Sequence, residues 1–451
     1  MTSKSYADRK YGALLDPDDL PRKWYNIVPD LPEPLAPMLN PHTREPMSVK
    51  DFEKLFPKEL VKQQFSMERW LDIPEEVWDA YRRLPRPTPL VRAKRLERFL
   101  KTPAKIYYKA EQFSPVGSMK PNSAIPQAYY AKKQGLTLAI SETGAGQWGS
   151  ALAMACSFFE LPARIYMVRV SSQQKPGRKI MMQTYGAEVL ESPSDRTKIG
   201  KKLLHENPNH PGGLGIAISE AIEDTFATEG SRYLLASAFN YALAHQTIIG
   251  LEVKQQMELL DEVPDIMCGC IGGGSNYSGF IYPFVREKMR KKIDTEFMAC
   301  EPSAVPSTTR GTFTYDYADT AEQTPLVKMY TVGHNFSNPP IHAGGLRYHG
   351  KAPSLSLLIY KKIVKSISYP QTKVFEAAKI FAQTEGVIVA PESSHGLRYA
   401  IDQATRCKKT NEKKVIVFNN CGHGLLDLSA YDEFNRGKMV DWSPEEIVAP
   451  Q

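Results

Sequence analysis

From residue 86 onward the chain alternates apolar segments of strand length with helical segments, and this alternation limits the possible folds most strongly. The expected strands are 105–110, 137–141, 163–168, 187–192, 265–271, 296–301, 387–392 and 414–419. Helical patterns such as 147–161, 178–186 and 373–386 lie between them. Strands separated by helices of this length are typical of parallel sheets covered on both faces. The sequence therefore predicts an α/β fold with doubly wound, mostly parallel sheets.

The length of the chain predicts more than one domain, because 451 residues exceed the usual size of a single domain. Residues 1–85 are rich in proline and charge, and we predict that they form an extension, with one helix over 48–64, that wraps the main body. We place one α/β domain at 86–245 and a second at 246–451. Residues 302–345 have little regular periodicity, and a loop of that length is usually functional.

Composition and charge exclude several classes of protein. The 57 Lys and Arg against 50 Asp and Glu give a net charge of +7 without a basic stripe, so we expect no nucleic-acid binding. No segment approaches the roughly 18 apolar residues of a membrane helix, and the first residues lack the apolar core of a secretory signal, so we expect a cytoplasmic protein. The six cysteines form no CxxC pair, which argues against zinc, and core packing is the expectation for Cys268 and Cys270. Five histidines also lack ligand spacing, and no metal site is predicted.

A glycine-rich turn at 270–280, CIGGGSNYSGF, joins an apolar strand to an apolar helix. Glycines let the backbone approach an anion closely, and the start of a helix offers free N–H groups. The turn lacks the lysine of a P-loop and the GxGxxG spacing of a dinucleotide fold. We interpret it as a phosphate-binding loop, and the alternative is a tight strand-to-helix turn.

A second strand-turn-helix lies at 137–155. The backbone amides from Thr143 to Gln147 can bind a carboxylate at the helix start, and Glu142 stands at the carboxyl end of the strand. Ligands of open α/β sheets collect at that edge. The alternative is a glycine-eased connection with a solvated glutamate.

Lys120, in the segment GSMKPNSA, precedes a proline that suits the first position of a helix. Its side chain therefore projects from a defined point at a helix start. Most lysines are simply solvated, but an amine combined with a separate phosphate-binding loop is what a pyridoxal phosphate enzyme needs.

Seven motifs, in chain order, resemble the tryptophan synthase β-chain family, specifically its second branch with the longer N-terminus. They are SETGAGQWGSALA, GRKIMMQTYGAEV, HQTIIG, GGGSN, HAGGLRYHG, EGVIVAPESSHG and CGHG, and the resemblance covers roughly residues 20 to 430. It implies a fold-type II pyridoxal phosphate enzyme, usually a homodimer, in which part of 86–118 packs with the C-terminal domain. It also implies activation by a monovalent cation, and it leaves open whether an α chain of tryptophan synthase docks.

The resemblance assigns roles to residues that match the motifs. Lys120 would be the Schiff-base lysine, Asn122 would lie near the phenolic oxygen of the cofactor, and Glu142 would be the acid/base carboxylate. The remaining assignments are the phosphate-binding residues Gly272, Gly273, Gly274, Ser275 and Asn276; the residues that bind the substrate carboxylate, Thr143, Gly144, Ala145, Gly146 and Gln147; and Glu392 and Cys421 at the pyridine ring.

The implied reaction is a β-replacement that makes L-tryptophan from indole and either L-serine or O-phospho-L-serine. Lys120 would take the α-proton, and Glu142 would serve the leaving group and indole. Two alternatives stay open: β-replacement with another nucleophile such as sulfide, and a cofactor-binding regulatory protein without turnover.

The chain departs from the family pattern at five positions. Met119 and Pro121 replace the usual His and Ile or Leu on either side of the lysine, and methionine cannot donate to the phosphate, so either the cofactor binds more weakly or another donor compensates. Pro126 predicts a missing hydrogen bond and a kink in the helix. Cys421 replaces a serine that faces the pyridine nitrogen. Arg347 replaces an aspartate that handles the serine hydroxyl, and its fork of donors suits a phosphate. We therefore hypothesise that O-phospho-L-serine is the better donor; the alternative is that Arg347 pairs with a structural carboxylate.

Overall fold

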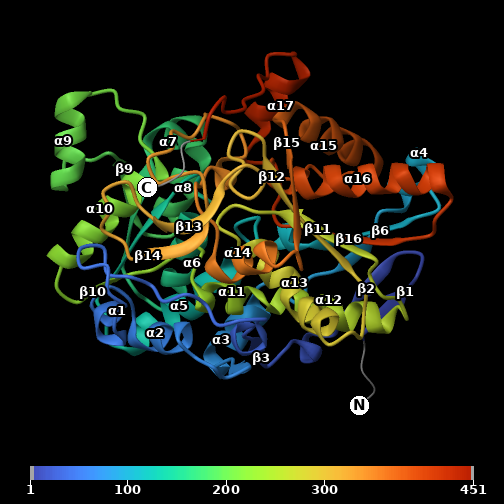
Figure 1. Ribbon diagram of the computed structural model, residues 1–451, viewed down its shortest axis with the longest axis horizontal. Coiled ribbons are helices and arrows are strands. Elements are labelled where there is room, and N and C mark those ends of the chain that lie inside the picture. The colour runs from blue at the N-terminus through green and yellow to red at the C-terminus, as the bar shows by residue number, and fades with distance from the viewer. Residues whose placement is uncertain (1–4, 448–451) are drawn as a thin grey trace.

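The computed structural model describes residues 5–447 and contains two large sheets surrounded by helices (Figure 1). Residues 1–4 and 448–451, the outer ends of the predicted extension and of the second predicted domain, lie outside the described residues. The predicted α/β class with mostly parallel strands is confirmed.

The larger sheet has eight strands in the order β1-β2-β5-β6-β16-β11-β12-β15. They are β1 (Tyr6–Asp8), β2 (Gly12–Leu14), β5 (Leu90–Arg92), β6 (Lys105–Ala110), β16 (Val415–Asn420), β11 (Ile266–Cys270), β12 (Glu296–Pro302) and β15 (Lys365–Tyr369). The strands from β6 to β15 are parallel, whereas β1, β2 and β5 pair antiparallel at the other edge. The helices around this sheet are α4 (Lys94–Leu100), α12 (Ile248–Leu259), α13 (Ser275–Met289), α14 (Pro353–Tyr360), α15 (Gln371–Glu385), α16 (Ser393–Thr410) and α17 (Leu428–Asn435).

The smaller sheet is wholly parallel and has the order β10-β7-β8-β9. Its strands are β10 (Ser231–Tyr233), β7 (Leu138–Thr143), β8 (Ala163–Val168) and β9 (Glu188–Ser192). Its helices are α5 (Pro121–Lys133), α6 (Gln147–Phe158), α7 (Arg169–Gln174), α8 (Pro176–Thr184), α9 (Lys198–Glu206), α10 (Leu214–Ala227) and α11 (Asn240–Gln246). Consecutive side chains of β7 from Ala139 to Thr143 are buried, so helices cover both faces of this sheet.

The N-terminal extension adds β1 and β2 to the edge of the larger sheet, and the rest of it runs along the lower side of the molecule, where Figure 1 draws it in blue. It contains the short pair β3 (Lys23–Tyr25) and β4 (Trp70–Asp72), the 3₁₀ turns η1 (Pro17–Asp19) and η2 (Val28–Asp30), and the helices α1 (Val49–Leu55), α2 (Lys58–Gln64) and α3 (Glu75–Arg83). The single helix predicted over 48–64 is wrong. Pro57 divides it, because a residue before proline disfavours helical geometry and Phe56 is accordingly extended.

Helix α5 continues through Pro126, and the extension supplies the hydrogen bond that this proline cannot make. A proline at this position has no N–H for the carbonyl oxygen of Asn122, four residues earlier. The hydroxyl of Tyr81, on α3, donates to that oxygen over 2.5 Å instead. Tyr81 is fully buried, so the interaction ties the extension to the helix that begins after Lys120.

Residues 302–345, predicted to be a long loop, contain an antiparallel hairpin of β13 (Thr312–Tyr317) and β14 (Leu326–Thr331). The hairpin packs in front of the sheets in Figure 1. The 3₁₀ turns η3 (Glu111–Phe113) and η4 (Gly344–Leu346) complete the described elements.

The predicted strand at 387–392 is also wrong. Only Val389 makes a β-bridge there, with His423, and the segment runs directly into α16. Both sides of β16 are occupied by β6 and β11, and β15, which the sequence analysis missed, takes the place beside β12. No helix within residues 5–447 has the length and apolar character needed to cross a membrane.

Candidate active site

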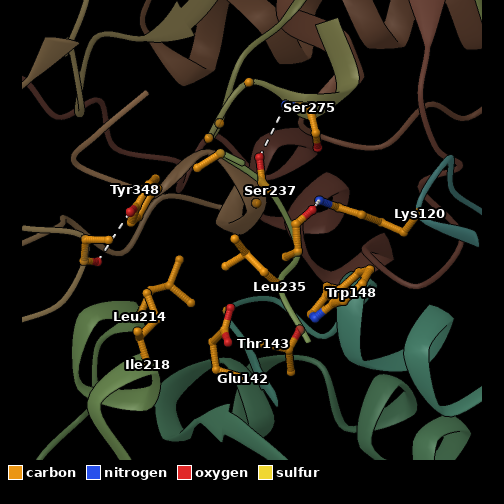
Figure 2. Close-up of a pocket in the computed structure, with 18 of the residues that line it drawn as sticks. Lys120, Glu142, Thr143, Trp148, Leu214, Ile218, Leu235, Ser237, Ser275 and Tyr348 are labelled. Carbon is orange, nitrogen blue, oxygen red and sulfur yellow. Dashed lines mark hydrogen bonds between the residues drawn. The ribbon is translucent and has the colours of Figure 1, made fainter. Parts of the chain in front are cut away.

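A cavity of about 140 Å³ draws its lining from both sheets, the hairpin and the N-terminal extension. Figure 2 shows Lys120 entering from one side, Ser275 and Ser237 at the top, and Glu142 with Thr143 at the bottom. Most of the residues predicted for the site therefore meet in one space. The exceptions are Asn122, Gly146 and Arg347, which do not line it.

Lys120 stands at the start of α5, where Pro121 takes the first helical position. Its Nζ lies 3.4 Å from the carbonyl oxygen of Ala236, and Figure 2 shows the side chain reaching into the cavity. Burial lowers the pKa of Lys120 to about 8, although nearby acidic groups, Cys421 first among them, oppose the shift. A lysine with such a pKa supplies a neutral amine more readily than a solvated one.

The glycine turn between β11 and α13 forms a bare cradle. A Cβ atom on Gly272 would lie 2.3 Å from the carbonyl oxygen of Gly345, and one on Gly273 would lie 2.6 Å from Ser237 Oγ. Gly274 has a φ of 116°, which only glycine adopts readily. The turn therefore leaves its backbone open at the start of a helix, as an anion site requires.

Ser237 adds a hydroxyl that the sequence analysis missed. Its oxygen accepts a hydrogen bond of 3.2 Å from Ser275 N, so its proton is left for a bound anion. Ser237 thus offers the donor that Met119 cannot provide. Asn276 plays a different part: its side chain donates to Cys270 O over 3.1 Å and accepts from Asn419 over 2.7 Å. That side chain fixes the turn, while the residue's N–H lies in the first turn of α13.

Glu142 lies near the end of β7 and is only 3% exposed. Burial raises its pKa to about 7, and a hydrogen bond from the hydroxyl of Tyr233 on β10 opposes that shift. Tyr233, which the sequence analysis also missed, is fixed by the pairing of β10 with β7. A carboxyl group with this pKa can both give and take a proton near neutral pH.

The turn after Glu142 lines the cavity with Thr143, Gly144, Ala145 and Gln147. The hydroxyl of Thr143 accepts from Gly149 N over 3.1 Å and so fixes the start of α6. Gly146 packs against Arg178 and does not line the cavity. It has a φ of 90°, and a Cβ there would lie 2.6 Å from the Cβ of Arg178. The geometry at the start of α6 suits a carboxylate.

Cys421 and Glu392 also line the cavity, and both act electrostatically on Lys120. Cys421 Sγ lies 3.1 Å from Ser393 Oγ and 3.6 Å from Cys270 Sγ, so Cys270 is a wall residue as well as a core residue. Glu392 Oε1 accepts from Gly345 N over 2.8 Å, whereas its buried Oε2 has no partner. A buried carboxylate oxygen without a partner is costly unless a ligand satisfies it.

Asn122 belongs to a buried ionic network beside the cavity. Its side chain accepts from Arg86 over 2.6 Å and donates to Glu111 over 3.0 Å and to Gln246 over 3.1 Å. Arg86 also pairs with Glu252 over 2.9 Å. Asn122 therefore holds the first turn of α5 in place, and its predicted position near the cofactor stays a prediction.

Arg347 lies just behind the lining. Its Nη2 donates to Ser171 Oγ over 2.9 Å, and a Cβ on Gly344, a lining residue, would lie 3.0 Å from that same nitrogen. The guanidinium is buried, and burial lowers its pKa. Within residues 5–447 no carboxylate forms an ion pair with it, but the charge of Glu392 partly opposes the effect of burial on the Arg347 pKa.

The other half of the cavity is apolar, and short sequence motifs do not reveal it. Leu55 and Phe56 come from the extension, Leu214 and Ile218 from α10, and Tyr348 from the segment after the hairpin. Figure 2 shows Leu214, Ile218 and Tyr348 on the side opposite Lys120. Phe56 also packs against Tyr233 and Phe239, with ring centroids 5.8 and 5.2 Å apart. These residues are far apart in the sequence, and each resembles an ordinary core residue.

The residues of the site fit pyridoxal phosphate. A glycine cradle with hydroxyl donors suits the phosphate, the Lys120 amine suits the aldehyde, and the unpartnered Glu392 oxygen and the Cys421 thiol stand at the wall between them.

The chain is similar to known proteins over nearly its whole length. Residues 81–422 match the model of the pyridoxal-phosphate dependent enzyme family. The chain is 55% identical to the tryptophan synthase beta chain of Thermococcus onnurineus, covering 97% of this chain and 98% of that one. It is 55% identical to tryptophan synthase beta chain 2 of Pyrococcus furiosus, over 95% and 96% of the two chains, and 54% identical to that of Aeropyrum pernix, over 98% of each.

Two solved structures share the fold at low sequence identity. Threonine deaminase isoform 2 of Solanum lycopersicum aligns with a TM-score of 0.59 at 17% identity, over 90% of this chain and 98% of that one. An L-serine ammonia-lyase from Rhizomucor miehei aligns with a TM-score of 0.57 at 18% identity, over 78% and 98%. With its cradle, its lysine and its near full-length likeness to these beta chains, the chain belongs to the tryptophan synthase beta chain family of pyridoxal-phosphate dependent enzymes.

Proposed function

We propose that this protein makes L-tryptophan by β-replacement, joining indole to the carbon skeleton of L-serine or O-phospho-L-serine. One observation carries the proposal: a lysine, a glycine cradle and a carboxyl with a pKa of about 7 share a cavity whose other half is apolar and aromatic. The polar half suits an amino acid on a phosphate-bearing cofactor. The apolar half suits indole.

Lys120 would hold the cofactor, with Gly272, Gly273 and Ser275 at its phosphate and Cys421 at its ring nitrogen. When bound, pyridoxal phosphate withdraws electrons from the α-carbon of the amino acid, so that an α-proton and a β-substituent can leave. The remaining work belongs to the protein. Ser237 offers a further hydroxyl to the phosphate, and Glu392 orients the turn that carries Gly345.

Lys120 and Glu142 carry out the proton transfers, and both have a pKa close to neutral pH. Lys120, with a pKa lowered to about 8, takes the α-proton as its neutral amine. The backbone of Thr143, Gly144 and Ala145 binds the substrate carboxylate and so sets the distance between the α-carbon and that amine. Glu142 gives a proton to the departing oxygen and accepts one from indole.

The apolar half of the cavity favours indole over the alternative nucleophile, sulfide. Phe56, Phe239 and Ile222 add to an apolar wall that a small anion does not need. Burying an aromatic ring against such a wall is favourable by about 25 cal/mol for each Å² removed from water. We therefore expect indole to react at low concentration, and a clear preference for sulfide would favour the alternative.

The choice of donor depends on Arg347, a buried guanidinium behind Gly344 that forms no ion pair within residues 5–447. A phosphate on the substrate would give this guanidinium a directly paired anion. The Arg347→Met variant should lower kcat/KM for O-phospho-L-serine at least about ten-fold and change that for L-serine far less. A general structural defect would lower both equally, and that result would remove the hypothesis.

A direct experiment tests the enzyme as a whole. The purified protein is scanned for the visible band of lysine-bound cofactor, and L-serine, O-phospho-L-serine and indole are added in turn while tryptophan is measured. Borohydride should fix a pyridoxyl group on Lys120. Lys351 is an internal control, because burial also lowers its pKa to about 8 but it does not line the cavity. A label on Lys351, or none on Lys120, would overturn the assignment.

A cofactor band without turnover of either donor would favour the other alternative, a regulatory cofactor-binding protein. We also propose that the chain forms a homodimer, which sedimentation can test, and that it works in the cytoplasm. All six cysteines are free thiols, as is typical of a reducing compartment. The same sedimentation measurement with an α chain added would show whether one docks.

A further inference from the structure

The tip of the β13–β14 hairpin, residues 318–325, lies against α10 at the apolar end of the cavity. Ala318, Thr324 and Pro325 of this hairpin tip line the cavity, and so do Leu214 and Ile218 of α10. The wall at this end is therefore shared by two elements about 100 residues apart in the sequence. Its shape depends on what holds them together.

Helix α10 presents two neighbouring stripes of residues. Leu214, Ile218 and Ile222, spaced by four, line the cavity. The adjacent stripe faces the hairpin tip: a Cβ on Gly215 would lie 2.2 Å from Thr320 Oγ1, and Ser219 Oγ donates to Asp319 Oδ2 over 2.7 Å. The contact between α10 and the hairpin tip is therefore made by residues next in sequence to those that line the cavity.

Asp319 is fully buried, and its carboxylate accepts several hydrogen bonds. Besides Ser219, its carboxylate accepts from Gln323 N over 3.0 Å, from Thr324 N over 2.9 Å and from Thr324 Oγ1 over 2.8 Å. Ala321 N also reaches Ser219 Oγ over 3.3 Å. Within the tip the carboxylate shapes the turn, and Ser219 is its contact with the helix.

No cation balances this carboxylate among the ion pairs of residues 5–447. A buried charge that is satisfied only by hydrogen bonds is sensitive to the loss of any one of them. The bond to Ser219 therefore contributes to the position of the tip as well as to stability. Because the tip carries Thr324 and Pro325, its position sets the width of the apolar end.

We propose that the Ser219–Asp319 hydrogen bond is a latch that fixes the shape of the apolar end of the cavity, so that both residues act as positioning residues for indole. The inference rests on the proposed function and identifies what confines its aromatic substrate. With the latch closed, indole is held and water is kept out. With it broken, indole leaves more easily and water enters, so that L-serine is broken down to pyruvate and ammonia, a balanced reaction that needs no other reactant.

The Ser219→Ala variant of the holoenzyme tests the latch, because alanine favours a helix and the fold should persist. KM for indole should rise at least about five-fold, since a hydrogen bond to a charged group is lost, while KM for the amino acid donor and kcat at saturating indole stay within about two-fold. The ratio of pyruvate to tryptophan should rise. Asp319→Asn, which keeps the shape of the side chain, should shift both values in the same direction.

Thr225→Val is the matched control. Thr225 lies on the same helix, and its hydroxyl donates to Ala221 O over 2.7 Å. Ser219 Oγ likewise lies 3.0 Å from Gly215 O, the carbonyl one turn back, but its one proton is shared with the shorter contact to Asp319. No hydrogen bond joins the Thr225 side chain to the hairpin tip among the described residues. This variant should leave KM for indole unchanged. An equal rise in this control, or an unchanged KM and pyruvate ratio in Ser219→Ala, would overturn the latch.

Calorimetric titration of each holoenzyme with indole gives a readout without turnover. If the parent binds indole but makes no tryptophan, the proposed function fails, and a five-fold weaker binding by Ser219→Ala would still support the latch. If the parent makes tryptophan and both proteins bind indole equally, the latch fails alone.

Discussion

The proton affinity of Glu142 results from two opposing effects. Burial raises its pKa, and the hydrogen bond from Tyr233 lowers it, leaving a value of about 7. Tyr233 is itself buried, and its pKa is well above the ordinary value, so it stays a donor at any pH of interest. Tyr233 therefore helps to set the pKa of Glu142.

The Tyr233→Phe variant should move the Glu142 limb of the pH profile of kcat/KM to higher pH. Without the hydroxyl the charged carboxylate loses a donor, so its pKa rises by about half a unit to one unit. Tyr348→Phe is the control, because the Tyr348 hydroxyl donates to Ala318 O over 3.3 Å and not to Glu142. A profile unchanged by Tyr233→Phe would show that Glu142 does not govern the rate.

At the scale of elements, α5 depends on α3 for one of its hydrogen bonds. Removing the Tyr81 hydroxyl leaves the buried carbonyl of Asn122 without a partner. We expect Tyr81→Phe to lower the free energy of unfolding by about 1–3 kcal/mol. Pro126→Ala restores the N–H that this carbonyl lacks, so Tyr81→Phe should cost clearly less in that background.

Denaturant unfolding of the parent, both single variants and the double variant measures this coupling. Additive losses would mean that the Tyr81 hydroxyl does not replace the helical bond. The same element shows why local sequence rules predicted a disturbed helix: a substitute donor 41 positions earlier in the chain is invisible to a local pattern.

At the scale of the whole molecule, two buried histidines make the fold sensitive to acid. Burial lowers the pKa of His245 to about 3 and that of His395 to about 4. The unfolded chain binds these protons near pH 6.5 and the folded chain does not, so stability is full above that pH and falls as the pH drops toward the folded values. At pH 5 each of these histidines should lower the free energy of unfolding by about 2 kcal/mol relative to neutral pH.

Urea unfolding at pH 7 and pH 5 checks this expectation. His245→Phe keeps a ring against Trp24, whose centroid lies 4.5 Å away, and should reduce the loss between the two pH values by about 2 kcal/mol. His42→Asn, at an exposed position, should not change the loss. An identical loss in all three proteins would place the acid sensitivity elsewhere.

Sequence patterns predicted the parts of the site that are short and contiguous. Lys120 before a proline, the glycine turn and the helix start after Glu142 each combine backbone geometry with chemistry inside a few residues. Phe56, Tyr233 and Ser237 lie outside such motifs and reach the cavity only through tertiary packing. The strand expected at 387–392 failed for a related reason, because a β-branched run does not reveal whether a sheet edge is free.

The pairing of β6 with β16 has a consequence for synthesis on the ribosome. The two strands lie side by side in the sheet, but β16 is translated about 300 residues after β6. At roughly 5 to 20 residues per second, an edge of β6 waits about 15 to 60 s for its permanent neighbour. During that interval the nascent polypeptide carries an unfinished hydrogen-bonding edge, a site where chaperones would be expected to act.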